Sequence, residues 1–202
     1  MRKIAMLVLF AVLTALCTLG VSAASAFENV EITEKTKLVD DAANNDKGGS
    51  GKPIAYMEAY GVGYSSLGDQ VVFEGVDFGK NGADKMHISF SYGNNDNTTT
   101  TLAVYIDKKT DKPAATYEIG YTGGWEKTKA KEIETKIDVP AGKHDIIVEF
   151  TNGKSGSFSY IRFDEAPVKP TAAPATADPV TVTVALAVLS LAGIVTAKKT
   201  RR

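Results

Sequence analysis

The sequence has very little of the chemistry that disulfides, metal centres and nucleophilic active sites need. Its 202 residues include one cysteine, two histidines and one tryptophan. Cys17 lies in an apolar N-terminal run, so residues 27–202 contain no cysteine and can form no disulfide. No cysteines and histidines stand at zinc spacing, and there is no G-x-S-x-G motif and no phosphate-binding glycine loop. Such a domain depends on its hydrophobic core for stability, or on a bound metal.

The two histidines do not form a site in the sequence. His87 occupies the polar phase of an alternating segment, which predicts a surface or cross-strand histidine. His144 follows the turn PAGK and alternates with Ile146, which predicts a partly buried structural histidine. Aspartate and glutamate are plentiful, so a carboxylate pair for glycoside hydrolysis stays open, but nothing singles out two of them.

Basic charge is scarce away from the two ends of the chain. Only 17 of the 23 basic residues lie within residues 27–176, against 23 of the 24 acidic ones, which gives this region a net charge of −6. The basic residues outside it are Arg2, Lys3, Lys198, Lys199, Arg201 and Arg202. An acidic domain binds polyanions poorly, so we do not expect a nucleic acid as partner.

Residues 1–26 have the parts of a secretory signal peptide. A short basic start precedes an apolar run over residues 4–19, and small residues ending in ASA follow it. We expect cleavage near Ala26, with VSA ending at Ala23 as the alternative. An uncleaved membrane anchor is the competing interpretation, but the apolar run is short for a bilayer-spanning helix.

The C-terminus predicts an anchor. Residues 166–179 form a Pro/Ala/Thr linker, residues 180–197 carry no charge, and residues 198–202 are the basic tail KKTRR. Eighteen residues barely span a bilayer as a helix, and a basic end is the side expected to stay in the cytoplasm. The folded part is therefore expected to face outward, anchored to the membrane or the cell wall.

The order of linker, apolar segment and basic tail resembles a sortase-type cell-wall sorting signal. The sequence APATA, residues 173–177, stands in the place of the LPxTG motif of that signal. Pro174 and Thr176 match, while alanine replaces both the leucine and the glycine. A plain membrane tether is the alternative to covalent attachment.

Period-two alternation predicts one all-β domain over residues 27–165. In DKMHISFSYG, Met86, Ile88, Phe90 and Tyr92 share one face. The other inward-facing sets are Leu102, Val104 and Ile106; Ala115, Tyr117, Ile119 and Tyr121; Ile133, Ile137 and Val139; and Ile146, Val148 and Phe150. Turn-forming sequences separate these segments, and no helical stripe appears between residues 54 and 165. The sequence predicts a β-sandwich or jelly roll, with an early strand in NVEITE and a long polar loop over residues 35–53.

The single tryptophan stands in a glycine-rich loop, YTGGWEK. A tryptophan in a loop either folds back over the core or offers its flat face to a ligand. A sugar ring has a matching face of C–H groups, and Tyr64 in GVGYSSLGD would complete an aromatic clamp with Trp125. Gly123 and Gly124 would let the backbone turn tightly enough to present the indole.

Four pieces of the sequence carry a resemblance to a known family. GVGYSSLGDQVVFEGVDFG, TGGWEK, AGKHDIIVEF and SFSYIRF occur in the order and approximate spacing of family 6 carbohydrate-binding modules. The resemblance covers residues 54–164, and the related family 35 is the nearest alternative. It implies a β-sandwich that binds a glycan without catalysis at its loop end, with Tyr64 and Trp125 on either side of a sugar ring. Ser157 stands where the family often has a third cleft residue, an asparagine.

The resemblance also implies a structural calcium ion between the first and last strands. Glu31 or Glu34 would supply the first-strand ligand, but Ser159 stands where the family has an aspartate, and a serine is a poor ligand for a hard cation.

Two other functions stay open. One is a structural or adhesive surface protein that has kept the sandwich and lost the sugar, which the serines at 157 and 159 favour. The other is a small glycoside-active enzyme.

Overall fold

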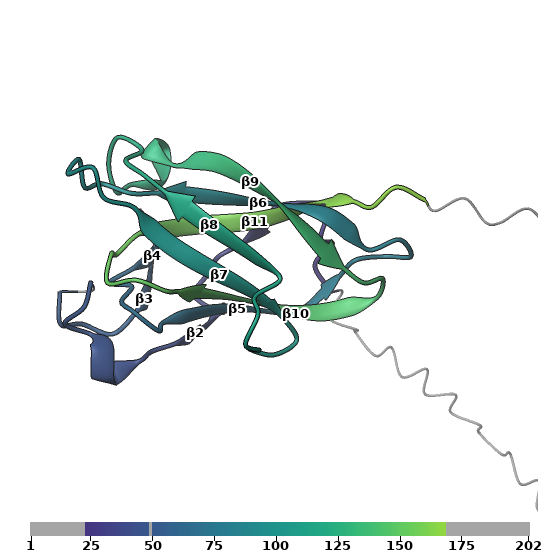
Figure 1. Cartoon of the computed structure of the whole chain (residues 1–202), viewed down its shortest axis with the longest axis horizontal. Helices are drawn as coiled ribbons and strands as arrows, with labels where there is room; N and C mark the ends of the chain where they lie inside the picture. The colour runs from purple at the N-terminus through teal and green to yellow at the C-terminus, as the bar shows by residue number, and fades with distance from the viewer. Residues whose placement is uncertain (1–22, 49, 169–202) are drawn as a thin grey trace, which may run out of the picture. The chain divides into compact units, whose positions relative to one another are not determined.

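The computed structural model describes residues 23–48 and 50–168 (Figure 1). Most of the expected leader, and the apolar segment and basic tail of the C-terminus, lie outside these residues. Among the residues that are described, no helix is long and apolar enough to cross a membrane.

Two antiparallel sheets form the fold, and in Figure 1 β6, β9 and β11 make the upper layer while β5 and β10 make the lower. The sheet with the order β1-β11-β6-β9 consists of β1 (Val30–Glu31), β6 (Ala83–Ser91), β9 (Lys131–Val139) and β11 (Ser157–Glu165). The sheet with the order β2-β5-β10-β7-β8 consists of β2 (Lys37–Val39), β5 (Gln70–Asp77), β7 (Thr100–Ile106), β8 (Ala115–Ile119) and β10 (Lys143–Phe150). The prediction of an all-β sandwich is confirmed.

Shorter elements lie among the loops. A two-stranded sheet joins β3 (Ala55–Met57) to β4 (Gly61–Gly63), and the two 3₁₀ turns are η1 (Ala42–Asn44) and η2 (Lys127–Lys129). The prediction of one long polar loop over residues 35–53 was wrong, because β2 and η1 lie within it. β2 has three residues between polar neighbours, so it has almost no alternating pattern, and its pairing with β5 defines it.

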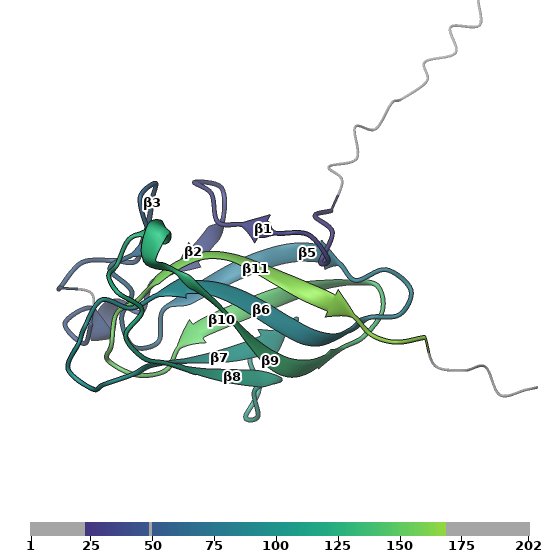
Figure 2. The same cartoon turned by 90° about the horizontal axis from the view of Figure 1, so that it is seen from above.

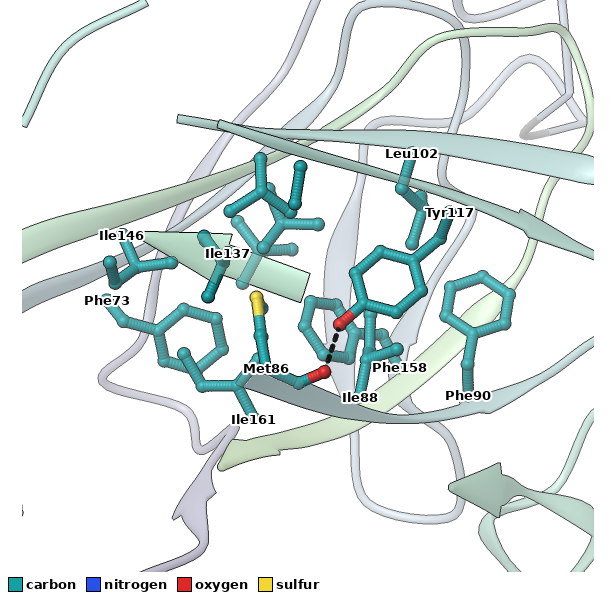
Figure 3. Packing of buried hydrophobic residues seen from close by; sticks show 14 of the residues in the cluster. Phe73, Met86, Ile88, Phe90, Leu102, Tyr117, Ile137, Ile146, Phe158 and Ile161 are labelled. Carbon is teal, nitrogen blue, oxygen red and sulfur yellow. Dashed lines mark hydrogen bonds between the residues drawn. The ribbon is translucent and has the colours of Figure 1, made fainter. Parts of the chain in front are cut away.

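The core lies between the two sheets and is rich in aromatic rings (Figure 3). Phe73 of β5 meets Phe158 of β11 edge to face, with ring centroids 5.8 Å apart, and Phe90 of β6 lies 6.2 Å from Phe150 of β10. The predicted inward set of β6 is fully buried, as is that of β10. The contacts between rings of opposite sheets hold the two layers together.

Three residues of the predicted inward sets are not buried. Ile106 ends β7 and Ile133 lies in the edge strand β9, and both are half-buried. Tyr121 is 45% exposed, because β8 ends at Ile119 and the alternation of that strand does not continue beyond it.

The strand register brings several distant loops to one end of the sandwich. Ser157 pairs with Ser91, Thr100 with Ile119, and Glu149 with Gln70, so the chain segments that adjoin these residues leave the sheets on the same side. Figures 1 and 2 show these loops together at the left. We call this the loop end; it comprises residues 40–69, 92–99, 120–130 and 151–156.

Both histidines have structural contacts. His87 lies on the outer face of β6, is 7% exposed, and is flanked by Glu132 of β9 and Asp164 of β11 at 3.3 and 3.0 Å. This confirms the prediction of a cross-strand histidine, and the hydrogen bond from His87 lowers the pKa of Asp164. His144 is partly buried and its Nδ1 lies 2.9 Å from Asp107 Oδ2. Neither histidine lies at the loop end.

One side-chain hydrogen bond crosses the core between the two sheets. Tyr117 of β8 donates its hydroxyl to the backbone carbonyl of Met86 in β6 at 2.8 Å (Figure 3). Burial raises the pKa of Tyr117 far above its ordinary value, so the hydroxyl keeps its proton and remains a donor.

We predict that Tyr117→Phe lowers the free energy of unfolding by about 1 kcal/mol, because it removes a buried hydrogen bond and leaves the ring in place. Tyr105→Phe is the matched control, since the buried Tyr105 side chain makes no hydrogen bond with any described residue. Urea unfolding of both variants measures the difference. Equal stabilities would contradict the prediction.

Candidate functional site

The loop end contains a cleft of about 540 Å³. Tyr64, Trp125 and Ser157, the three residues expected to bind sugar, all line this cleft. They come from the end of β4, from the loop between β8 and η2, and from the start of β11. Folding therefore brings together side chains from three distant parts of the chain.

Trp125 is half-buried and lies against two residues that follow β6. The edge of Tyr92 meets the indole at 5.6 Å with an interplanar angle of 80°. On another side the indole contacts the backbone of Gly93 so closely that a Cβ at residue 93 would overlap the ring. The position of Trp125 is thus set by core packing as well as by its own loop.

Backbone hydrogen bonds fix the loop that carries Trp125. Ser91 donates its hydroxyl to the carbonyl of Trp125 at 2.8 Å, and Thr122 exchanges two hydrogen bonds with the backbone of Tyr92 at 2.9 and 3.0 Å. Gly123 has a φ of +116°, a conformation that L side chains rarely adopt. The predicted need for a glycine in this turn is therefore met at Gly123.

Tyr64 follows β4 directly and has an unusual backbone conformation. Its φ is +59°, which is uncommon for a residue other than glycine. The preceding strand β4 lies so close to β11 that a Cβ at Gly61 would overlap the carbonyl of Phe158. Local backbone strain of this kind persists where surrounding contacts determine it, and it is frequent at binding sites.

A buried serine links the Tyr64 loop to the loop before β11. The Ser65 hydroxyl donates to the carbonyl of Gly156 at 3.0 Å and accepts the Gly156 N–H at 3.0 Å. Ser157, one residue further on, is 4% exposed and lines the cleft. A nearly buried hydroxyl at a cleft wall can still donate or accept one hydrogen bond with a ligand.

Asp69 holds the same loop through hydrogen bonds to its backbone. Its carboxylate accepts the backbone N–H groups of Ser66 and Asp41, each at 2.7 Å, and the residue is fully buried. Burial raises the pKa of this carboxyl, against the effect of the two N–H donors. Asp69 therefore has a structural role, holding the loops that carry the cleft.

Nine of the described residues that line the cleft were not predicted as cleft residues from the sequence, among them Tyr60, Asn94, Lys154 and Ser155. Asn94 donates its amide to the hydroxyl of Tyr92 at 3.3 Å, and its carbonyl oxygen has no partner among the described residues. A carboxamide is therefore present in the cleft, on a different loop from Ser157. Asn94 lies in the turn sequence GNNDN, where nothing distinguishes it from its neighbours.

The residues expected to hold calcium do not form a suitable donor set. Glu31 of β1 and Glu34 in the following turn are both exposed, and the buried Ser159 hydroxyl is neutral. Among the described residues, no three aspartate, glutamate, histidine or cysteine side chains come close enough to hold a metal ion. The residues present therefore do not fit a calcium ion, which binds six to eight oxygen ligands including carboxylates.

The family of the chain follows from its sequence. The sequence profile described as "Carbohydrate binding module (family 6)" matches residues 41–169. The chain belongs to the family 6 carbohydrate-binding modules. The matched region contains the cleft residues and all of the strands from β3 to β11. The family part of the resemblance is thereby confirmed.

Solved structures to which the chain is similar include other carbohydrate-binding modules. A family 6 module from Clostridium stercorarium in complex with cellobiose is 18% identical, with a TM-score of 0.49, covering 71% of this chain and 98% of its own. A family 6 module from Clostridium cellulolyticum in complex with xylose is 19% identical, with a TM-score of 0.47 and coverages of 70% and 99%. A family 35 module from Clostridium thermocellum is 17% identical, with a TM-score of 0.44 and coverages of 68% and 92%. No curated protein gives a significant match to this module.

We predict that Gly93→Ala displaces the indole of this module and costs about 1–3 kcal/mol of stability by overpacking. Gly120→Ala is the matched control, because a Cβ there meets nothing within 4 Å. Thermal unfolding and the emission spectrum of the single tryptophan measure the effect. If the two variants have the same spectrum and stability, the contact with Gly93 does not position Trp125.

Proposed function

We propose that the module binds a polysaccharide or oligosaccharide without catalysis, in the cleft between Tyr64 and Trp125. The observation that carries the proposal is the presence of both aromatic side chains in one cleft, together with the hydroxyl of Ser157. A ring of each residue can stack on the C–H face of a sugar, and the polar groups can bind its hydroxyls.

The residues that line the cleft support a binding module over an enzyme. None of the described lining residues is a histidine, an aspartate or a glutamate. Glycoside hydrolysis usually requires two carboxyl groups on either side of the scissile bond. This cleft offers aromatic rings, hydroxyls and an amide, which suit recognition.

The alternative is a structural or adhesive surface protein that has lost the sugar. The serine at 157 favours it, because the family often has an asparagine at that place. Asn94 argues for retained binding, since it brings a carboxamide into the same cleft from the β6–β7 loop. A glycan screen separates the two functions.

We also propose that the module is exported and anchored through residues 166–202, to the membrane or by sortase to the cell wall.

For the leader, cleavage after Ala23 accounts for the structure better than cleavage after Ala26. Ala24 accepts the N–H of Asp77 at 2.9 Å, and Ala26 is fully buried and bonded to the backbone of Asp77 and Phe163 at 3.0 and 2.8 Å. Cleavage after Ala26 would remove these contacts from the folded domain.

We predict that the exported chain begins at Ala24. Intact mass and N-terminal sequencing of protein from the cell envelope determine the first residue. A mature chain that begins at Phe27 would contradict the prediction.

For the cleft, we predict that Trp125→Ala weakens binding of the cognate glycan by about 2 kcal/mol or more, as the loss of a central aromatic anchor does. Tyr64→Ala should act in the same direction but less strongly. Tyr121→Ala is the control, because Tyr121 is an exposed aromatic that does not line the cleft. Calorimetric titration of a glycan identified by array measures each affinity. Unchanged binding by Trp125→Ala would exclude the clamp, and release of reducing ends from the glycan would indicate an enzyme.

A further inference from the structure

Among the described residues that line the cleft, the one charged side chain is a lysine. Lys154 lines the cleft beside Tyr64, and the Nζ of Lys52 lies 4.7 Å from the centroid of the Tyr64 ring. Residues 27–176 as a whole have a net charge of −6. The sign of the charge at the cleft is therefore opposite to that of the module.

Lys154 is held in place through its backbone. Thr100, which is buried, donates its hydroxyl to the carbonyl of Lys154 at 2.9 Å, and the N–H of Lys154 donates to Asn152 Oδ1 at 3.3 Å. The Nζ of Lys154 lies 3.7 Å from Asp96 Oδ2, which is beyond hydrogen-bond distance. Lys154 is therefore ion-paired with Asp96 without a hydrogen bond, so Asp96 partly compensates its charge while its N–H donors can still turn to a ligand.

Lys52 lacks an acidic partner. No aspartate or glutamate among the described residues forms an ion pair with it, and its Nζ lies over the ring of Tyr64. A cation over the face of a tyrosine is attracted by about 0.5–1 kcal/mol at an exposed site. Its charge therefore remains uncompensated next to one side of the proposed clamp.

We propose that, although the net charge of the module disfavours polyanions in general, the glycan bound here is anionic, with a carboxylate or sulfate group on a sugar held by Lys154 and attracted by Lys52. This inference rests on the proposed function of the cleft. A neutral sugar gains little from an ammonium group, whereas a carboxylate or sulfate forms a charge-assisted hydrogen bond about twice as strong as a neutral one. The hydroxyls of Ser155 and Ser157 and the amide of Asn94 supply further donors in the same cleft.

Pairs of glycans with one backbone and different charge test the proposal. Polygalacturonate is compared with its methyl-esterified form, and a sulfated galactan with its desulfated form, by calorimetric titration of the full chain. We expect one charged member to bind about tenfold more tightly than its neutral partner at low salt. The advantage should shrink in about 0.5 M NaCl, because salt screens interactions between exposed charges. Which pair shows it distinguishes carboxylate from sulfate.

The variants Lys154→Gln and Lys52→Gln assign the effect to the cleft. Each should reduce the preference for the charged glycan over its neutral partner severalfold. Lys80→Gln is the matched control, because it changes the net charge equally at an exposed residue of the β5–β6 turn, away from the loop end. Trp125→Ala should abolish binding of both members of a pair.

The results separate this inference from the function on which it rests. Equal affinity for charged and neutral partners, with both lost in Trp125→Ala, would overturn the anionic ligand and leave the glycan-binding cleft in place. A charge preference that Lys80→Gln reduces as much as Lys154→Gln would overturn the role of the cleft lysines. Absence of binding to every member of both pairs and to a neutral glycan array would overturn both proposals.

Discussion

The indole of Trp125 lies against the bare backbone of Gly93 and the edge of Tyr92, and the shape of the loop end depends on this contact. Tyr92 is fully buried and continues the inward face of β6. The tryptophan is therefore attached to the core through a buried ring, and one of its sides is fixed before any ligand arrives. A rigid aromatic surface loses little conformational entropy on binding, which would favour the proposed stacking on the C–H face of a sugar.

The loop that carries Tyr64 is also held in place by hydrogen bonds. The buried Ser65 joins the Tyr64 loop to the segment before β11, and the carboxylate of Asp69 satisfies two backbone N–H groups beneath it. Both walls are thus tied to strands of the sandwich. The antiparallel register pairs Ser157, which lines the cleft, with Ser91, whose hydroxyl binds the carbonyl of Trp125, so the fold also positions the cleft.

The parts of the fold that sequence predicts well are those where burial repeats every second residue. Met86, Ile88 and Phe90 alternate without interruption, and all are buried. Prediction failed where tertiary contacts decide the outcome. β2 exists because β5 offers it a pairing edge, and Tyr121 is exposed because its strand ends two residues earlier.

The same distinction applies to the cleft. The glycine-rich context and the family pattern made Trp125 and Tyr64 visible in the sequence, and both line the cleft. Asn94 and Lys154 lie in ordinary polar turns, and only the packing of loops far apart in the chain brings them to it. The topology of the fold makes them cleft residues, and no local sequence pattern predicts this.

The proposed glycan binding requires a sugar ring to contact the indole of Trp125. The chain has a single tryptophan, so its fluorescence can report this contact. Titration of the full chain with its glycan, followed by tryptophan fluorescence, reports on that contact directly. We expect a saturable change in tryptophan emission whose midpoint matches the affinity from calorimetry. Saturable glycan binding with an unaltered emission spectrum would place the sugar elsewhere and contradict it.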